Sequence, residues 1–443
     1  MSKNPWAVAC TALALTAVAA CGNAAETGGT DDDAAPAPSG AAPSEAAERE
    51  VIKVGVYGPA QIPQGQDVRD GAQLAADEIN EAGEGHEIEI VFCASENGAK
   101  PEKAVACANK FAQEDEVDAI VGGFSSGETL AMLDTVVQAQ IPYLSTGAAA
   151  PDVVKDVTSD GPRKYIFRVG PINSTFLAAD MCATFVTQLA PATGYTKFGI
   201  LYEDVEFARP LVAFLEQCLP NPKAATGGAI PVDQGVEVVG IEKHLPDATD
   251  FSSQFGALEA AGAQFVIEVN SRQEGVALAA QWGTLQPSFA LGGINVAGQA
   301  NGYFEATGGG AAYQLNGPAG IVRAEISEVT IPFYDAFEGA YDREPIYNGA
   351  SAYDSIYTLH EAVERAGSVE PDDVVTELEA TDRVGSQGRL TFNEAHDVVY
   401  GAGDPSKGVV PLYYQFTPEG EKQVVFPKAL AGDAAYTKPP FAQ

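Results

Sequence analysis

Short apolar runs alternate with longer amphipathic segments along the chain from residue 51 to residue 295. A short run of apolar and β-branched residues bounded by turn residues predicts a buried strand, whereas apolar residues at helical spacing predict a helix. The pattern predicts strands at 51–58, 86–93, 117–123, 141–147, 164–170, 197–204, 236–245, 264–270 and 289–295. It predicts helices at 66–83, 100–115, 127–140, 173–190, 207–219, 250–263 and 272–285.

Strands that alternate with helices in this way indicate βαβ units, which are right-handed and build parallel sheets. The units are too numerous for one compact sheet, and a second series restarts after residue 170. We therefore predict an α/β fold with two doubly wound parallel-sheet lobes. Ligands of such sheets bind beyond the carboxyl ends of the strands, where helix N-termini point. The corresponding turns are 58–66, 122–129, 145–151, 203–207, 270–272 and 292–296.

The chain of 443 residues is strongly acidic, with 61 Asp and Glu against 25 Lys and Arg and a formal charge of −36. Such a surface repels phosphate backbones, so we expect no nucleic-acid partner. Hydrophobic residues make up 46% of the chain, which is enough for a large core in two or three domains. The four histidines are scattered and no C-x-x-C motif occurs, so we expect neither a metal site nor a cofactor.

The N-terminus is typical of a targeting segment. Lys3 precedes an apolar run at 7–20 that is too short to span a membrane as a helix. The small residues directly before Cys21 resemble a bacterial lipobox. This resemblance implies a signal peptide at 1–20, cleavage before Cys21 and lipid attachment to that cysteine. The alternative is an ordinary signal peptide with an incidental cysteine.

The segment after Cys21 supports an anchored protein. Residues 22–50 lack aromatic residues and are rich in Ala, Pro, Gly, Ser and acids. This composition cannot form a core, so we predict that 21–50 comprises the lipidated cysteine and a disordered tether. The chain would then lie outside the cytoplasm, anchored by lipid to the outer face of a bacterial cell membrane.

The chain has six cysteines, of which Cys10 would leave with the signal peptide and Cys21 would carry the lipid. Four remain for the folded part, and this number fits an oxidising exterior. Four cysteines allow three pairings. Cys93 ends a predicted strand and Cys107 lies on the helix just after it, whereas Cys182 and Cys218 lie on consecutive predicted helices. We therefore favour the disulfides Cys93–Cys107 and Cys182–Cys218.

Residues 123–127, Gly-Phe-Ser-Ser-Gly, spell the G-x-S-x-G pattern between a predicted strand and a predicted helix. A hydrolase carries its nucleophile in this context, which would make Ser125 the nucleophile. The pattern also occurs by chance, no HGGG-type oxyanion segment lies upstream, and His244, His360 and His396 occupy no distinctive loop after a late strand. We favour a turn that holds a ligand; a serine hydrolase and a turn without a ligand are the alternatives.

Seven segments carry short motifs whose order along the chain is more informative than any single one. The segments are 54–80, 100–111, 118–131, 141–153, 165–171, 349–367 and 385–397. They include a G-P turn, a P-x-x-A helix, a G-x-x-S-S turn, an I-P strand, an F-R pair and a late Y-D helix followed by a hairpin. From about residue 51 to residue 420, the chain resembles the branched-chain amino-acid (Leu/Ile/Val) binding proteins of ABC importers, a type I periplasmic binding-protein family.

The resemblance implies two lobes that are joined by three crossovers and close on a ligand like a hinge. It divides the chain into lobe 1, at 51–170 plus 324–390, and lobe 2, at 171–323 plus 391–443. It further implies a receptor that captures a small molecule and presents it to an ABC permease and its ATPase. A sensor of the same fold without a transport role is the alternative. We expect a monomer that is not an enzyme.

The resemblance also assigns the grip on a ligand carboxylate to backbone N–H groups and a serine hydroxyl. Carried over, the serine is Ser125 or Ser126, and a small-residue turn is formed by Gly147, Ala148 and Ala149. The residues after 121–123 begin a predicted helix, whose free N–H groups and positive dipole end favour an anion. Small residues let the backbone approach a ligand closely.

Three positions depart from the family pattern. Gln64 stands where an aromatic residue is frequent, and Phe207 stands where a tyrosine is usual. The acid that holds a ligand ammonium should fall near 292–296, but Ile294 and Asn295 are uncharged. An amino acid, an amide and a carboxylate therefore all remain possible ligands.

Two further pairs of residues are weaker candidates. Asn270 and Ser271 end a strand of lobe 2 and could face the cleft, although asparagine is as often a turn former. Tyr347 and Tyr353 lie at the beginning of a lobe 1 helix, and packing in the core is the alternative role for both.

Overall fold

The computed structural model describes residues 49–96 and 98–443. The predicted signal peptide, the lipidation site Cys21 and the tether up to residue 48 lie outside these residues. Within the described part of the chain, no helix combines the length and the apolar character that a membrane span requires.

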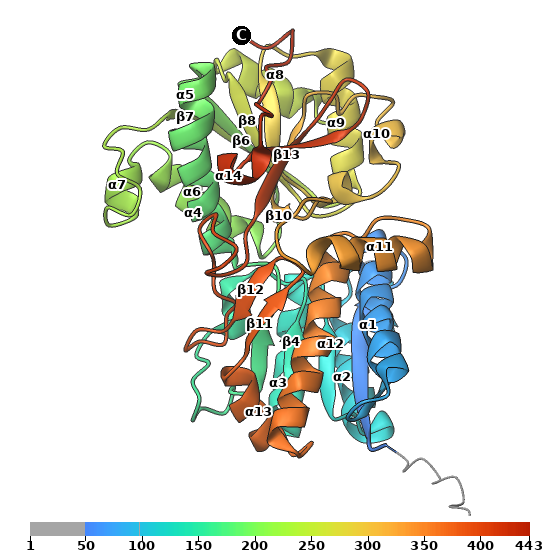
Figure 1. Cartoon of the computed structure of the whole chain (residues 1–443). Helices are drawn as coiled ribbons and strands as arrows, with labels where there is room; N and C mark the ends of the chain where they lie inside the picture. Colours follow the sequence, from blue (N-terminus) through green and yellow to red (C-terminus); the bar gives the residue numbers. More distant parts are fainter. Residues whose placement is uncertain (1–48, 97) are drawn as a thin grey trace, which may run out of the picture. The chain divides into compact units, whose positions relative to one another are not determined.

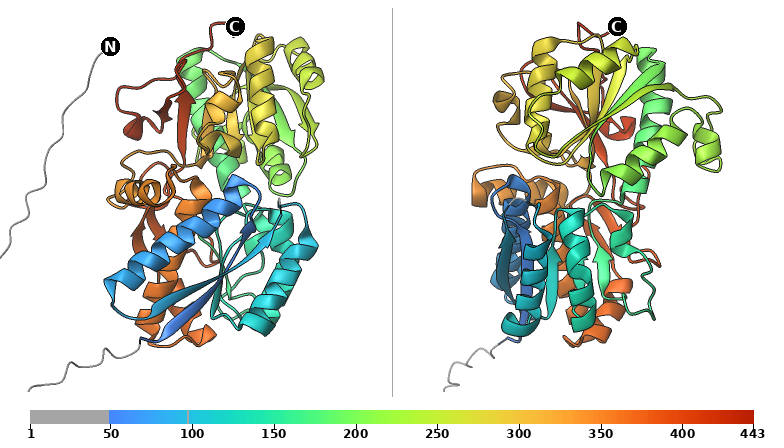
Figure 2. Two further views of the ribbon diagram at one scale, coloured as in Figure 1. Left: turned by 90° about the vertical axis from the view of Figure 1, so that its right-hand side faces the viewer. Right: turned by 180° about the vertical axis from the view of Figure 1, so that it is seen from behind.

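Lobe 1 is built around a five-stranded parallel sheet with the strand order β2-β1-β3-β4-β5. Figure 2 shows helix α1 (Pro63–Ala82), in blue, running across this sheet. Helix α12 (Tyr347–Ala366) packs beside α1, although the two are far apart in sequence. The strands are β1 (Val51–Pro59), β2 (Glu87–Ser95), β3 (Ala119–Gly122), β4 (Tyr143–Ser145) and β5 (Ile166–Arg168).

The other face of the lobe 1 sheet is covered by α2 (Pro101–Lys110) and α3 (Ser126–Ala139). Successive strand residues point to opposite faces, so Val54 and Val56 face α1 whereas Tyr57 faces α2 and α3. The remaining helical segments of lobe 1 are η1 (Phe111–Asp115), η2 (Pro151–Val154), α11 (Thr330–Tyr341) and α13 (Pro371–Glu379). A hairpin of β11 (Asp382–Gly385) and β12 (Gly388–Thr391) follows α13.

Lobe 2, the upper part of Figure 1, is built around a seven-stranded sheet. Its strand order is β14-β13-β10-β9-β8-β6-β7. Its parallel strands are β6 (Lys197–Glu203), β7 (Glu237–His244), β8 (Phe265–Asn270), β9 (Ala290–Asn295) and β10 (Leu315–Gly320). The last two, β13 (Leu412–Phe416) and β14 (Lys422–Phe426), join as an antiparallel hairpin.

The antiparallel hairpin corrects the prediction that both sheets are parallel. The chain returns to lobe 2 from lobe 1 just before β13, so β13 starts at the sheet edge where the parallel strands end. It therefore runs against β10, with Leu412 opposite Gly320 and Tyr414 opposite Asn316. Sequence periodicity also missed β10, β13 and β14.

The helices of lobe 2 cover both faces of its sheet (Figures 1 and 2). They are α4 (Ser174–Thr184), η3 (Phe185–Leu189), α5 (Ala190–Thr193), α6 (Ala208–Cys218), α7 (Pro222–Ala225), α8 (Ser252–Ala260), α9 (Glu274–Leu285), η4 (Val296–Gln299), α10 (Tyr303–Ala306) and α14 (Lys428–Ala431). The predicted helix at 173–190 is thus α4 continued by the wider turns of η3.

The chain passes between the two sheets three times: from β5 to α4, from β10 to α11 and from β12 to β13. This confirms the prediction of two lobes joined by three crossovers. The residue boundaries of the two lobes stay a prediction.

A buried ion pair joins two of these passages. The guanidinium of Arg168, at the end of β5, lies 2.9 Å from the carboxylate of Asp397, and both side chains are almost fully buried. Asp397 also accepts a 2.6 Å hydrogen bond from the side chain of Asn173, whose own oxygen caps α4 in lobe 2. Arg168 and residues 396 and 398 exchange backbone hydrogen bonds as well. Asp397 therefore connects the end of the lobe 1 sheet to the first helix of lobe 2.

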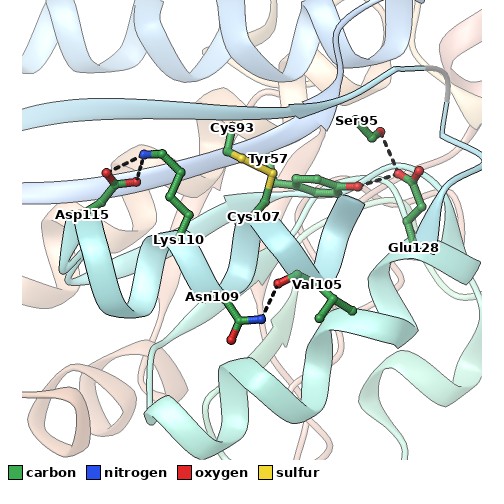
Figure 3. Close-up of a disulfide and its surroundings, with 9 residues drawn as sticks. All are labelled: Tyr57, Cys93, Ser95, Val105, Cys107, Asn109, Lys110, Asp115 and Glu128. Carbon is green, nitrogen blue, oxygen red and sulfur yellow. Dashed lines mark hydrogen bonds and ion pairs between the residues drawn. A yellow bond between two sulfur atoms is a disulfide. The ribbon is translucent and has the colours of Figure 1, made fainter. Parts of the chain in front are cut away.

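The two disulfides predicted from the sequence are confirmed. Cys93 on β2 is bonded to Cys107 on α2, and Cys182 on α4 is bonded to Cys218 on α6. Figure 3 shows the first bond, which clamps α2 against the sheet beside the ring of Tyr57. Each bond links neighbouring elements within one lobe.

Burial raises the pKa of several acids inside the lobes, among them Asp67, Asp180 and Glu268. The pKa of Asp67 rises to about 7, against the opposing effect of the Arg343 guanidinium. The pKa of Asp180 rises to about 6, although two tyrosine hydroxyls donate to it. The pKa of Glu268, on β8, rises to about 8 although three side-chain amides donate to its carboxylate.

These acids predict that the folded chain is less stable at pH 8 than at pH 5.5. Each raised pKa means that the folded chain holds a proton which the unfolded chain, with carboxyl pKa values near 4, has already released. The free energy of unfolding therefore falls as pH rises through this window, by on the order of 1 kcal/mol or more. Urea unfolding of residues 49–443 at several pH values measures this slope.

The variant Glu268→Gln should show a smaller slope, because the substituted amide does not titrate. Glu237→Gln, at an exposed position on β7, is the matched control and should leave the slope unchanged. A wild-type stability that is flat or increases between pH 5.5 and pH 8 would contradict the prediction.

Removal of each disulfide is expected to lower the free energy of unfolding by a different amount. Replacing Cys93 and Cys107 by serine opens a loop of 14 residues, and the same change at Cys182 and Cys218 opens a loop of 36 residues. Because the unfolded chain gains more freedom from the longer loop, the expected losses are about 3 and about 4 kcal/mol. Urea unfolding compares the two double variants with the wild type, and a larger loss for the shorter loop would disprove this ranking.

Candidate ligand-binding site

A cavity lies where the strand ends of lobe 1 face those of lobe 2. It encloses about 480 Å³ of space that protein atoms do not fill, part of it open to solvent. The lining residues are Phe124, Ser125, Ser126, Gly147, Ala149, Pro171, Leu177, Val205, Glu206, Phe207, Ser271, Arg272, Ile294, Val296 and Tyr347.

The N-terminus of α3 forms the polar wall on the lobe 1 side. Ser125 is the N-cap residue, in an extended conformation, and its side chain makes no capping hydrogen bond. The backbone N–H groups of residues 126–128 have no backbone acceptor in the described chain, as expected for the first turn of a helix. These donors and the positive end of the helix dipole make the wall attractive to an anion.

The glycines of the G-x-S-x-G segment have a backbone role. Gly123 has a φ of +88°, which favours glycine, and a Cβ atom there would lie only 2.5 Å from the hydroxyl of Tyr143. The tyrosine hydroxyl donates to the carbonyl of Gly122 over 2.9 Å. The tight turn between β3 and α3 therefore explains the glycine without invoking a nucleophile.

No histidine lines the cavity, although all four histidines lie in the described part of the chain. His244 bonds Asn270, His396 pairs with Glu379, and His86 and His360 both contact Glu364. No imidazole therefore stands beside Ser125 to act as a general base.

Glu128 fixes the first turn of α3 to the rest of lobe 1 (Figure 3). Its carboxylate accepts hydrogen bonds from the hydroxyl of Tyr57 at 2.6 Å, the hydroxyl of Ser95 at 2.9 Å and the backbone N–H of Lys100 at 2.8 Å. Burial raises the pKa of Tyr57 far above its ordinary value, so the hydroxyl stays a donor. The α3 N-terminus is thereby held by β1, β2 and the loop before α2.

A turn of small residues after β4 forms the neighbouring wall. Ser126 reaches this turn and accepts a 3.1 Å hydrogen bond from the backbone N–H of Ala150. The hydroxyl of Tyr347 donates to the carbonyl of Gly147 over 3.3 Å. A Cβ atom at Gly147 would lie 2.4 Å from the carbonyl oxygen of Gly123, so only glycine lets the two turns approach this closely.

Lobe 2 supplies a mainly apolar wall with two charges. Val205 and Phe207 come from the β6–α6 turn, and Ile294 and Val296 flank the end of β9. The β6–α6 turn also places one carboxylate, Glu206, in the lining, and the β8–α9 turn places one guanidinium, Arg272, there.

The Arg272 guanidinium is already partnered. It lies 3.3 Å from the carboxylate of the buried Glu203 and donates to the carbonyl of Gly98 in lobe 1 over 3.1 Å. Glu203 also accepts from both the backbone N–H and the hydroxyl of Ser271. Burial, and secondly the charge of Glu203, raise the pKa of the nearby Glu274 to about 8. This cluster sets the shape of the β8–α9 turn.

The structure brings most of the predicted ligand-binding residues to one cavity. Those that line it are Ser125, Ser126, Gly147, Ala149, Phe207, Ser271 and Tyr347. Tyr353, by contrast, packs against Phe333 in the core of lobe 1, with ring centroids 4.7 Å apart.

Four predicted residues lie behind the lining. Asn270 and Asn295 are fully buried and both donate to Glu268 in the interior of lobe 2. Gln64 donates to the carbonyl of Ser271 over 3.2 Å, and the carbonyl of Ala148 accepts from Arg168 over 3.2 Å. These residues support the walls of the cavity; a ligand contact by any of them stays a prediction.

Sequence reasoning missed Glu206 and Arg272 as lining residues. Both lie in strand-to-helix turns that the sequence singled out, at 203–207 and 270–272. Periodicity locates such turns, but it does not say which side chain of a turn faces the opposite lobe.

Comparison with known proteins agrees with this architecture. A family model described as periplasmic binding protein matches residues 52–399. The chain is 24% identical over 383 residues to the leucine-, isoleucine-, valine-, threonine- and alanine-binding protein of Pseudomonas aeruginosa, covering 79% of this chain and 87% of that protein.

Two solved structures share the fold. A type 1 periplasmic binding protein from Bordetella pertussis superposes with a TM-score of 0.69 at 19% identity, over 85% of this chain and 99% of its own. A solute-binding protein of an ABC transporter from R. palustris, in complex with benzoate, has a TM-score of 0.67 at 16% identity, over 88% and 99% of the two chains. Because the family model spans most of the sequence and the fold agrees, the chain belongs to the periplasmic binding protein family.

Proposed function

We propose that the chain is the extracytoplasmic solute-binding receptor of an ABC importer. It captures a small metabolite between its lobes and presents it to a permease and its ATPase. The observation that carries this proposal is the cavity itself, in which the free N-terminus of α3 faces an apolar wall from the other lobe.

The lobe 1 wall suits a ligand carboxylate. The first N–H groups of α3 and the Ser125 hydroxyl are free to donate, and an anion there interacts favourably with the helix dipole. Gly147 and Ala149 leave room for a ligand close to the backbone. Ser126 is held by Ala150 through its oxygen, so its hydroxyl hydrogen can still point to the ligand.

The lobe 2 wall suits a small apolar body. Val205, Phe207, Ile294 and Val296 offer only carbon atoms from their side chains. The relative from Pseudomonas aeruginosa is named for leucine, isoleucine, valine, threonine and alanine, and the R. palustris structure contains benzoate. Both kinds of ligand combine a carboxylate with a small, largely apolar body, and we propose the same combination here.

Capture works by closure of the two lobes. Three hydrogen bonds between the lobes border the cavity: Gln64 to Ser271, Arg272 to Gly98, and the Tyr347 N–H to the side chain of Gln299. A ligand that contacts both walls favours the state in which these bonds form, in proportion to its difference in affinity for the two states.

Transport requires partner chains and a place at the membrane. An ABC permease and an ATPase belong to the proposal. Lipid attachment at Cys21 also belongs to it and rests on the lipobox-like residues before that cysteine, which lie outside the described part of the chain.

The proposal predicts that Ser125→Ala weakens binding of carboxylate ligands about tenfold or more. Losing a hydrogen bond to a charged group costs roughly 1.5–3 kcal/mol. Residues 49–443 with both disulfides intact are screened by thermal unfolding against amino acids, amides and amine-free carboxylates. Calorimetry then compares the affinity of the wild type and the variant for each compound that binds.

Ser253→Ala is the matched control, because Ser253 is exposed in the first turn of α8 and lies outside the cavity lining. Its affinity should equal that of the wild type. If Ser125→Ala bound every carboxylate as tightly as the wild type, the α3 N-terminus would not be the anion site. If no compound of the panel bound, the proposed receptor function would fail for this chemistry.

A further inference from the structure

One charge in the cavity lining lacks a close counter-charge. Glu206 lies in the β6–α6 turn, and its carboxylate makes no hydrogen bond to another described residue. Its nearest cation is Arg209, at 3.8 Å, but Arg209 is bound more closely to Asp204, at 2.8 Å. The second charged residue of the lining, Arg272, is matched by Glu203. The lining of the cavity is therefore left with one excess negative charge.

The carboxylate of Glu206 faces the positive wall of lobe 1. Its Oε2 atom lies 3.2 Å from the position that a Cβ atom would take on Gly127. Gly127 is the second residue of α3, directly beside Ser125 and Ser126. Glu206 thus stands next to the N–H groups where the proposed function places the ligand carboxylate.

A partial positive charge and a full negative charge therefore lie side by side at one end of the cavity. The α3 N-terminus attracts an anion, and Glu206, from the other lobe, attracts a cation. A molecule that carries an anionic and a cationic group on the same carbon atom can interact with both charges at once, and an α-amino acid is such a molecule. An amine-free carboxylate interacts favourably only with the α3 N-terminus and brings its own negative charge close to Glu206.

We propose that Glu206 binds the ammonium group of the ligand and selects α-amino acids over the corresponding amine-free acids. This inference rests on the proposed function and names the ligand class of the same cavity. It also assigns the acid that the uncharged positions Ile294 and Asn295 do not supply. The counter-charge comes from the turn after β6 instead of the turn after β9.

The test uses pairs of compounds that differ only in the amine: leucine with 4-methylpentanoate, phenylalanine with 3-phenylpropionate, and alanine with propionate. Titration calorimetry on residues 49–443 gives the affinity for each compound. For a pair that binds, the wild type should prefer the amino acid about tenfold or more, because each charged hydrogen bond contributes a factor of this size.

Glu206→Gln should remove most of this preference. Affinity for the amino acid should fall about tenfold or more, whereas affinity for the amine-free acid should stay the same or rise, because a neutral amide no longer repels it. Glu216→Gln, at an exposed position on α6 outside the lining, is the control and should retain the wild-type preference. The partial exposure of Glu206 and its lack of hydrogen bonds make the variant compatible with folding, which thermal unfolding verifies.

Four results would overturn the inference. A wild type that binds carboxylates without preferring the amine would disprove it while leaving the proposed function intact. A Glu206→Gln variant whose affinity falls equally for both members of a pair would show that the substitution acts on the structure of the cavity and not on the ammonium group. A variant that gains affinity for both would show that Glu206 competes with ligands for α3. Absence of binding to every pair would overturn the inference and the carboxylate-binding function together.

Discussion

The ion pair between Arg168 and Asp397 is the interaction on which the arrangement of the lobes depends. It joins the end of the lobe 1 sheet to the third passage of the chain, and through Asn173 it reaches the first helix of lobe 2. Arg168 also bonds the carbonyl of Ala148 and so holds the small-residue turn of the cavity. A buried charge is costly without its partner, so burial keeps this pair together and fixes the crossovers beside the ligand site.

The parallel strands explain why ligand-binding groups gather at the cavity. In both lobes the carboxyl ends of the strands meet the N-termini of helices, and the two sheets present these edges to each other. Lobe 1 contributes backbone donors at α3, held in place by Glu128. Lobe 2 contributes apolar side chains and the carboxylate of Glu206. The polarity of the site thus follows from topology in one lobe and from one side chain in the other.

Sequence patterns predicted the fold well where secondary structure is locally encoded. The helix expected at 66–83 is α1, and the residue that ends it, Gly83, has a left-handed backbone conformation. Both disulfides join elements that are close in sequence. The hairpin of β13 and β14 was missed, because its place in the sheet depends on a return from the other lobe. Glu206 was missed for a related reason: its role depends on facing Gly127, some eighty residues away in the sequence.

The sequence by itself determined the α/β class, the two lobes, the disulfide pairs and the turns that carry the site, because periodicity, glycine positions and strand ends are local properties. Only the tertiary structure decided which side chains face the cavity. It placed Asn270 and Asn295 behind the wall and Glu206 in it, although all three lie at strand ends in the sequence. The physical reason is that a side chain acquires its neighbours from packing and burial across the whole lobe, and such neighbours leave no local pattern in the chain.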